Sequence, residues 1–270
     1  IMKALSKIYI YGILVLILML GSALIANKKS ETIQTNSNVA LSNTKIEWGI
    51  KRGNNHEQPD LGSKNKSLIE KYDGMAMGNK ESKNIYVTFD LGYEAGYTAK
   101  ILDVLKGNNV QAAFFITAHY VNTASDLVQR MIGDGHIIGN HTVNHKSMPS
   151  LSEKNLTDEM MNLHTAIYEK FGYEMKYMRP PKGEYSERDL SVCRKIGYTA
   201  VMWSFAYADW DEAKQPSQSE AIKKIIDNTH NGEIMLLHAT SKTNMEVLDT
   251  VIKQIKNMGY EFKSLDEFVR

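Results

Sequence analysis

The stretch NIYVTFD, residues 84–90, opens the regular part of the chain: it is an apolar run that ends in an aspartate. Six further apolar runs follow it, with helical patterns between them. The expected strands cover 84–90, 110–117, 136–141, 175–179, 198–204, 233–238 and 260–264. The expected helices cover 95–107, 122–133, 152–170, 186–196, 217–230 and 243–257. Strands that alternate with helices in this way predict a parallel sheet, either open or closed into a barrel.

The residues at the strand ends favour the barrel. Asp90, His141, Arg179 and His238 can all take part in chemistry, and each falls at the carboxyl end of a different expected strand. An open sheet gathers ligands mainly at its switch point, whereas a barrel brings every carboxyl end to one mouth. We therefore expect an α/β fold, a distorted (β/α) barrel of about seven parallel strands.

Capping residues mark where several of the expected helices begin and end. Ser150 with Glu153, and Ser186 with Asp189, fit capping boxes at two helix starts. A glycine follows each of four helices, where a left-handed residue commonly ends the helix. These glycines are Gly172, Gly197, Gly232 and Gly259.

Composition limits the class of protein. The 270 residues are 43% apolar, enough for a full core, and 32 basic against 31 acidic side chains give a net charge of +1. Such a balance provides no broad electrostatic field for nucleic acid or an anionic membrane. The only cysteine, Cys193, excludes an internal disulfide and lies in a helical pattern, where we expect a buried, inert thiol. The sequence contains no indication of the oligomeric state.

The first 83 residues differ from the rest. Lysines precede the uncharged run IYIYGILVLILMLGSALIA at residues 8–26, which is near the ~20 residues that a helix needs to cross a bilayer. Residues 1–26 are therefore expected to be an uncleaved anchor or a cleaved signal, with the body outside the cytoplasm. Residues 27–83 are polar and indicate a linker and extension, in which Trp48 and Tyr72 could dock onto the body.

Two of the eight histidines have the spacing of metal ligands. His141 and His145 follow a strand in GNHTVNH, and a helical turn would put residues four apart on one face, as a shared ion requires. Alone the pair is also compatible with two solvated side chains. Five more histidines lack a partner at this spacing. We expect the side chains of His56 and His230 to be solvated, and those of His119, His136 and His164 to have structural or surface roles.

The remaining strand ends offer acid–base groups. Asp90 precedes a Gly-containing turn, where it could accept a proton from a metal-bound water or simply cap the next element. Arg179, stiffened by two following prolines, could orient a carboxylate. His238 ends an apolar run and could equally be a satisfied core histidine.

Taken together, these motifs over residues 84–268 resemble the polysaccharide deacetylase family, carbohydrate esterase family 4, with its NodB-type domain. The resemblance implies that residues 84–270 form a catalytic domain that hydrolyses acetamides on N-acetylated sugars with a divalent metal, usually zinc. By position, Asp90 is similar to the general base, Arg179 to the residue that holds it, His238 to the general acid and Asp209 to its carboxylate partner. The expected metal ligands are His141 and His145.

The same resemblance implies where the substrate is held. The backbone N–H near Lys182 matches the donor to the oxyanion, and Trp210 matches part of the sugar-binding wall. Tyr93 and Pro181 are expected beside them as substrate-binding residues.

One position departs from the family motif. Where the family has a second aspartate as third metal ligand, this chain has Leu91, which cannot coordinate; water or Glu94 could take that place. This change, with GYEAGYTAKILDVL, KYMRPPKGEYSER and LLHATSKTN, resembles the PdaA-like subgroup of delta-lactam-forming N-acetylmuramic acid deacetylases. The resemblance implies an enzyme that acts on peptide-free muramic residues of spore cortex peptidoglycan, where the freed amine closes on the lactyl carboxyl as a lactam.

Two other functions use the same sequence features. A deacetylase of N-acetylglucosamine in peptidoglycan or chito-oligosaccharides would need the same residues. A non-catalytic glycan-binding protein would need neither Asp90 nor a metal, and Leu91 is compatible with that loss. Metal-dependent release of acetate distinguishes the enzymes from the binding protein.

Overall fold

The computed structural model describes residues 40–270, of which Ser42–Arg270 form one compact unit. The expected anchor or signal at 1–26 lies outside the described residues. Within the described part of the chain, no helix combines the length and apolar character needed to cross a bilayer.

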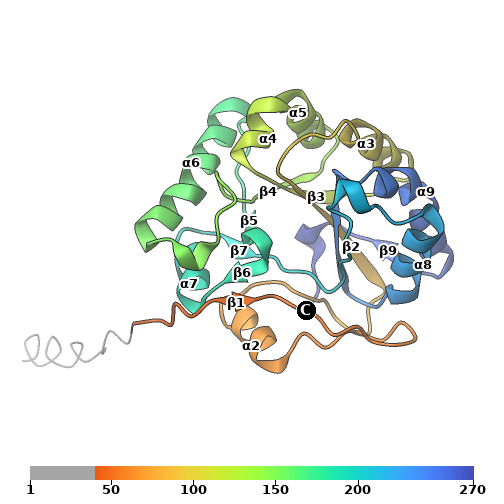
Figure 1. The fold of residues 1–270 in the computed structure, drawn as a ribbon, viewed down its shortest axis with the longest axis horizontal. Coiled ribbons are helices and arrows are strands. Elements are labelled where there is room, and N and C mark those ends of the chain that lie inside the picture. Colours follow the sequence, from red (N-terminus) through yellow and green to blue (C-terminus); the bar gives the residue numbers. More distant parts are fainter. Residues whose placement is uncertain (1–39) are drawn as a thin grey trace, which may run out of the picture. The chain divides into compact units, whose positions relative to one another are not determined.

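A curled parallel sheet of seven strands forms the centre of the unit (Figure 1). Six strands follow the order β7-β5-β4-β3-β2-β8, and β9 also pairs with β2. Their bounds are β2 Asn84–Leu91, β3 Ala112–Ile116, β4 Ile137–Asn140, β5 Tyr177–Met178, β7 Thr199–Ala200, β8 Glu233–His238 and β9 Glu261–Phe262. The expected parallel, seven-stranded α/β fold is confirmed.

The sheet curls into a half-barrel that is only partly closed. Its end strands, β7 and β8, are not paired with each other along their lengths. Instead the chain after β7 makes isolated parallel bridges, Val201 with Met75 and Phe205 with Met235. The strands β5 and β7 have two residues each, so few hydrogen bonds are available to close the barrel on that side.

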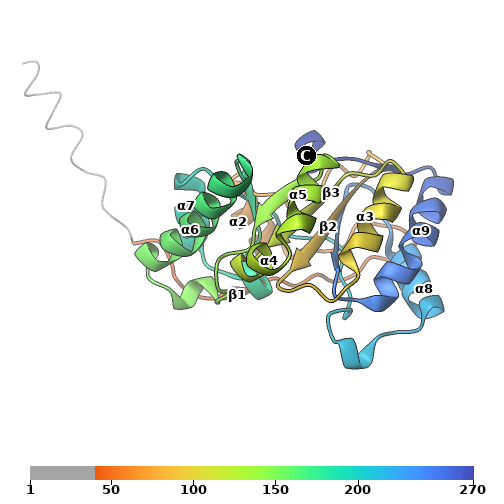
Figure 2. The same ribbon diagram turned by 90° about the horizontal axis from the view of Figure 1, so that it is seen from above.

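Helices cover the outer side of the curled sheet in an arc from α6 to α8 (Figure 1). They are α3 Thr98–Gly107, α4 Ala118–Thr123, α5 Ser125–Gly133, α6 Glu153–Phe171, α7 Glu187–Lys195, α8 Gln218–Asn228 and α9 Lys242–Asn257. Short 3₁₀ turns lie between them: η1 Met148–Ser150, η2 Pro181–Gly183, η3 Glu212–Lys214 and η4 Leu265–Glu267. Seen from above, the turn η3 projects beyond the rest of the unit, on the side toward which β2 points (Figure 2).

Strand β2 shows how the core orients the site. All but its first residue are buried, as in parallel strands covered on both faces. Successive side chains point to opposite faces of a strand. Val87, Phe89 and Leu91 belong to the main core, together with residues of the helices, which leaves Thr88 and Asp90 for the concave side.

The segment 42–83, for which composition indicates a linker and extension, packs against the body. Strand β1, Ile46–Glu47, pairs antiparallel with β6, Glu184–Tyr185, and helix α2 covers Ser63–Lys71. Trp48 and Tyr72 are buried, and the Trp48 indole N–H donates to the Trp203 carbonyl at 2.9 Å. The compact unit therefore begins about forty residues before the regular strand–helix alternation.

The predicted helix ends are mostly confirmed. Ser186 and Asp189 form the expected capping box of α7, and all four glycines have positive φ. Gly232 lies in the turn before β8 rather than directly after a helix. The predicted box at Ser150 is wrong: Ser150 ends the turn η1, and Ser152 caps α6 by accepting from the Asn155 N–H at 3.2 Å.

Candidate active site

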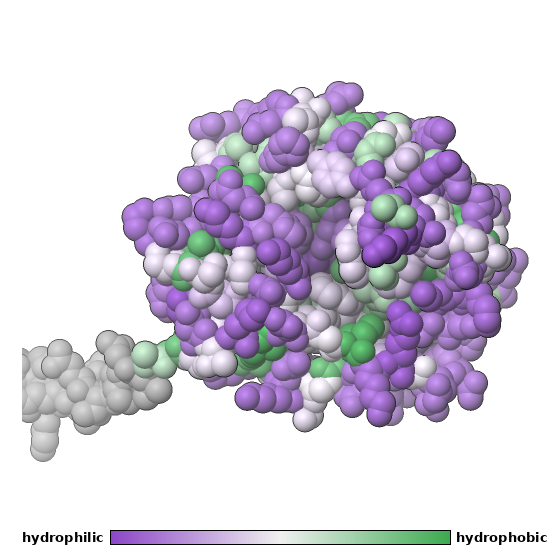
Figure 3. All heavy atoms as spheres, in the orientation of Figure 1, coloured by the Kyte–Doolittle hydropathy of each residue, from purple (hydrophilic) through white to green (hydrophobic). Residues whose placement is uncertain are grey.

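A cavity of about 1040 Å³ opens at the carboxyl ends of the strands. Figure 3 shows it as a hollow near the centre of the face toward the viewer. Asp90 near the end of β2, His141 just after β4 and His238 at the end of β8 all line it. Asp90 and His238 are direct partners in the register of β2 and β8.

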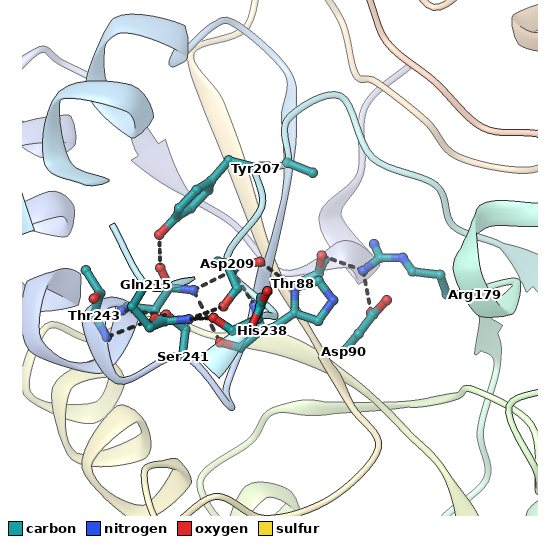
Figure 4. A network of polar contacts seen from close by, with 12 residues as sticks. Thr88, Asp90, Arg179, Tyr207, Asp209, Gln215, His238, Ser241 and Thr243 are labelled. Atoms are coloured by element: carbon teal, nitrogen blue, oxygen red, sulfur yellow. Dashed lines mark hydrogen bonds and ion pairs between the residues drawn. The ribbon is translucent and has the colours of Figure 1, made fainter. Parts of the chain in front are cut away.

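Arg179 and Asp90 form a buried ion pair beneath the cavity. The Arg179 guanidinium is fully buried and donates from Nη1 to Asp90 Oδ1 at 2.8 Å and to Thr88 Oγ1 at 2.9 Å (Figure 4). Its other nitrogens donate to the carbonyls of Val201 and Met202, so all three guanidinium nitrogens are bonded. Burial alone would raise the pKa of the Asp90 carboxyl, but the charge of Arg179 holds it below its usual value.

A glycine makes room for the support of this pair. The Arg179 guanidinium lies 4.3 Å from the centre of the Phe115 ring. Gly139 in β4 lies against the same ring, and a Cβ atom there would be 2.4 Å from Phe115 Cδ1. Only glycine therefore allows Phe115 this close to the neighbouring strand.

His238 is held by a second buried carboxylate. Asp209 Oδ1 lies 2.7 Å from His238 Nδ1, and Asp209 Oδ2 accepts from the His238 backbone N–H at 2.8 Å. The Asn244 side chain also donates to Asp209, and Tyr207 donates to Asn244. Burial acts to lower the pKa of His238, but the hydrogen bond and charge of Asp209 raise it above the ordinary value. Since Nδ1 faces Asp209, Nε2 is the nitrogen left for the cavity.

His141 and His145 lie together, but not on a helical turn. Their ring centres are 4.8 Å apart. Thr142 and His145 have positive φ, so the chain bends sharply between the two imidazoles and the predicted helical geometry is wrong. The bend holds because Thr142 N–H donates to Asn140 Oδ1 and His145 N–H donates to Thr142 Oγ1.

Glu159 in α6 stabilises this bend, which the sequence did not indicate. Its carboxylate accepts from the Asn144 backbone N–H at 2.8 Å and from the Asn144 side chain at 2.7 Å. No spacing rule relates Glu159, inside a helix, to Asn144, 15 residues earlier, so only the fold reveals the pairing.

The two imidazoles have the protonation that a metal ion needs. His141 Nδ1 donates to the Arg179 carbonyl at 2.9 Å, which leaves Nε2 free, 3.5 Å from Asp90 Oδ2. Burial lowers the pKa of His141 and lowers that of His145 to about 4, so both are neutral near pH 7. A neutral imidazole nitrogen with its partner nitrogen hydrogen-bonded is the usual form of a metal-binding histidine.

A third protein ligand is not in place. Leu91 is buried on the helix-facing side of β2 and does not line the cavity. Glu94, which with water was one of two alternatives for this place, is bonded elsewhere: its carboxylate accepts from the N–H groups of Gly96 and of Thr98 at the start of α3, and from the Tyr120 hydroxyl. Among residues 40–270, no group of three His, Cys, Asp or Glu side chains is arranged to hold a metal ion. The donors fit an ion held by two imidazoles, with water or substrate in the other positions.

Most of the expected substrate-binding residues line the cavity. Tyr93 and Trp210 are exposed at its rim, 44% and 57% respectively, and Lys182 also lines it. The Tyr93 hydroxyl donates to Glu212 in η3, which connects the loop after β2 to the segment before α8. Pro181 is buried within the turn η2 and is not among the residues that line the cavity, so its contact with substrate stays a prediction.

The other histidines and Cys193 are placed as follows. His119, expected in a structural or surface role, lines the cavity. We expected a solvated His230, but its side chain is buried and its Nε2 lies at hydrogen-bond distance, 2.8 Å, from Ser204 Oγ. Burial lowers the pKa of His230 to about 4. The helix pattern could not reveal this, because α8 ends at Asn228 and the chain then turns inward. Cys193 is buried as expected, and burial raises the pKa of its thiol.

Comparison with known proteins shows what the whole chain is similar to. Residues 77–201 match the family model described as polysaccharide deacetylase. The peptidoglycan-N-acetylmuramic acid deacetylase PdaA of Bacillus subtilis is 42% identical over 85% of this chain and 88% of its own length. A peptidoglycan-N-acetylglucosamine deacetylase of Bacillus cereus is 30% identical over 74% of this chain and 73% of its own. The solved structure of Bacillus subtilis PdaA, a family 4 carbohydrate esterase, superposes on this structure with a TM-score of 0.82. The match covers 84% of this chain and 98% of the PdaA chain.

Proposed function

The chain belongs to the polysaccharide deacetylase family, carbohydrate esterase family 4, and from that membership we propose that it removes the acetyl group of N-acetylmuramic acid in peptidoglycan. The observation that carries the proposal is the convergence of two buried pairs, Asp90 with Arg179 and His238 with Asp209, on a cavity that His141 and His145 also line. A glycan-binding protein would not need acid–base groups held in this way.

The proposed hydrolysis uses a divalent metal ion. We assign His141 and His145 as its ligands and zinc as the ion. When bound there, a divalent ion would polarise the acetyl carbonyl and acidify the attacking water.

The chain's own residues carry the proton transfers. Asp90 is the general base and takes a proton from the water as it attacks, while Arg179 fixes the direction of the carboxylate. The backbone N–H of Lys182 donates to the developing oxyanion, a type of contact whose loss commonly costs about 10²–10³ in rate. His238, kept protonated by Asp209, gives its Nε2 proton to the departing amine. The products are acetate and an amino sugar.

The substrate class follows from the similarity to PdaA, whose name specifies N-acetylmuramic acid. The alternative substrate is N-acetylglucosamine, which is named for the Bacillus cereus relative at 30% identity. The test is acetate release by the purified protein from peptide-free muramyl glycan and from chito-oligosaccharide. We expect release from the first; release from chito-oligosaccharide alone would contradict the assignment.

We also propose that the product leads to muramic delta-lactam in the spore cortex. The freed amine on C2 and the lactyl carboxyl on O3 of one sugar are close enough to close a lactam with loss of water. Analysis of digested glycan for muramic lactam tests this step: open, deacetylated muramic acid alone would limit the chain to the hydrolysis.

The proposed site of action is outside the cytoplasm. Peptidoglycan lies there, and the apolar segment 8–26 would export or attach the chain. We assign the catalytic machinery to residues 84–270, with the packed segment 42–83 as its extension.

A further inference from the structure

The proposed substrate differs from N-acetylglucosamine by one group. Muramic acid carries a lactyl ether on O3, and its carboxylate is negatively charged when no peptide is attached. O3 is on the carbon next to the one that bears the acetamide. With the acetamide over Asp90, His141 and His145, the lactyl carboxylate must therefore lie within a few ångströms, on the wall of the same cavity. A cation on that wall would distinguish the two sugars, if the proposed function holds.

Lys182 is the cation in the right place. Among the described residues that line the cavity, it is the only lysine or arginine. Arg179 lies beneath the cavity, but its guanidinium is buried and already bound to Asp90, Thr88 and two carbonyls. His141 and His145 of the metal-binding bend line the same cavity as Lys182, so its ammonium faces the space in which the acetamide would lie.

No acidic side chain of residues 40–270 lies within 4 Å of the Lys182 ammonium. Glu184, two residues on, is 3.3 Å from Lys45 Nζ instead. The Lys182 side chain is exposed, so its charge is available to a ligand that enters the cavity.

The backbone holds Lys182 in an uncommon conformation. Its φ of 60° lies in the left-handed region, which lysine seldom adopts and which often marks a functional position. The turn is fixed on both sides, because Gly183 N–H donates to the Pro180 carbonyl and the Gly183 carbonyl accepts from Trp48 N–H. Gly183 also packs against Trp203, where a Cβ atom would be 2.8 Å from the indole. The side chain of Lys182 therefore leaves a rigid turn at the cavity.

We propose that the ammonium of Lys182 binds the free lactyl carboxylate of muramic acid and makes the enzyme selective for sugars without a stem peptide. A stem peptide converts this carboxylate into an amide and removes its charge. One contact would then discriminate against both N-acetylglucosamine, which lacks the group, and peptide-substituted muramic acid, in which the group is neutral.

The test compares one glycan in two forms: peptide-free muramyl oligosaccharide, and the same oligosaccharide with its lactyl carboxyls converted to methylamides. Equilibrium binding is measured by calorimetry and acetate release in parallel, with the full chain. The wild type is expected to prefer the free carboxylate by about 10–100-fold, the range for a hydrogen bond to a charged group. This preference should shrink as salt rises, because an exposed charge pair is screened.

In Lys182→Met the preference is expected to fall to about 1, and in Lys182→Arg to stay near the wild-type ratio. Lys182→Asn is a second neutral variant whose side chain tolerates positive φ, in case the methionine variant does not fold. Lys176→Met, an exposed lysine directly before β5 and outside the cavity lining, is the matched control and should keep the wild-type ratio.

A wild-type ratio near 1, or a wild-type ratio retained by both neutral variants, would overturn the role of Lys182. Failure of the proposed function gives a different result: no acetate would be released from either glycan by any variant, while the binding ratio would still report on Lys182.

Discussion

Asp90 and His238 stand opposite each other in the register of β2 and β8, each with its own buried partner. The charge of Arg179 lowers the pKa of the Asp90 carboxyl, and the hydrogen bond and charge of Asp209 raise the pKa of the His238 imidazole. The two strands thus place a proton acceptor and a proton donor on one wall of the cavity. An amide hydrolysis needs both, since the water must lose a proton and the amine must gain one.

Removal of either group should stop acetate release. We expect Asp90→Asn and His238→Ala each to lower kcat by about 10²–10⁴, the usual contribution of general acid–base catalysis. Acetate release on muramyl glycan measures the effect, and circular dichroism checks the fold. His56→Ala, on an exposed loop of the extension, is the control and should keep wild-type kcat. Wild-type turnover by either active-site variant would refute the roles assigned here.

The Asp209–His238 pair predicts a pH dependence. Because Asp209 raises the pKa of His238, the acid form of the imidazole persists to higher pH than in a free histidine. In Asp209→Asn that support is lost and burial lowers the pKa, so the alkaline limb of the kcat profile should move to lower pH. Asp126→Asn on the surface of α5 should leave the limb in place. An unchanged limb in Asp209→Asn would show that another group sets it.

The metal assignment predicts a change in stoichiometry. His141→Ala and His145→Ala should each reduce bound zinc from about one equivalent to near zero at micromolar free ion, because a single remaining imidazole is a weak site. Metal content after dialysis measures this without reference to activity. His164→Ala, a histidine outside the cavity, is the control. Retention of one equivalent by the double variant His141→Ala with His145→Ala would place the ion elsewhere.

Gly139 should be sensitive to a single methyl group. The Cβ atom of Gly139→Ala would push into the Phe115 ring, and such overpacking typically costs about 1–3 kcal/mol in the free energy of unfolding. Gly133→Ala adds the same methyl at the end of α5, where no atom lies within 4 Å, and should not destabilise. Denaturant unfolding of the two variants compares them directly. Equal stability would mean that the contact between β4 and Phe115 relaxes without cost.

The parts that sequence predicted best are governed by local patterns. Apolar runs and helical spacing located all seven sheet strands, and their parallel order brought Asp90, His141 and His238 to one cavity. Capping chemistry was correct at Ser186, where the box is complete, and wrong at Ser150, because Ser152 offered a competing cap two residues later.

The parts that sequence missed depend on contacts between distant residues. The bend at 141–145 requires positive φ at two non-glycine residues, which Asn140 and Glu159 stabilise from elsewhere. Polar composition at 42–83 indicated a linker, but a few apolar residues such as Trp48 suffice to pack the segment onto the body. Glu94 looked available as a ligand until the fold showed its carboxylate bound to α3 and Tyr120.

The most direct test of the account is acetate release from peptide-free muramyl glycan by chelator-treated protein, before and after zinc is restored. We predict release at or near background after chelation and recovery of most of the untreated rate with zinc, in the wild type but not in Asp90→Asn. Undiminished release by the metal-free protein, or recovery by Asp90→Asn to the wild-type rate, would contradict the central claim that a metal held by His141 and His145 acts with this carboxylate.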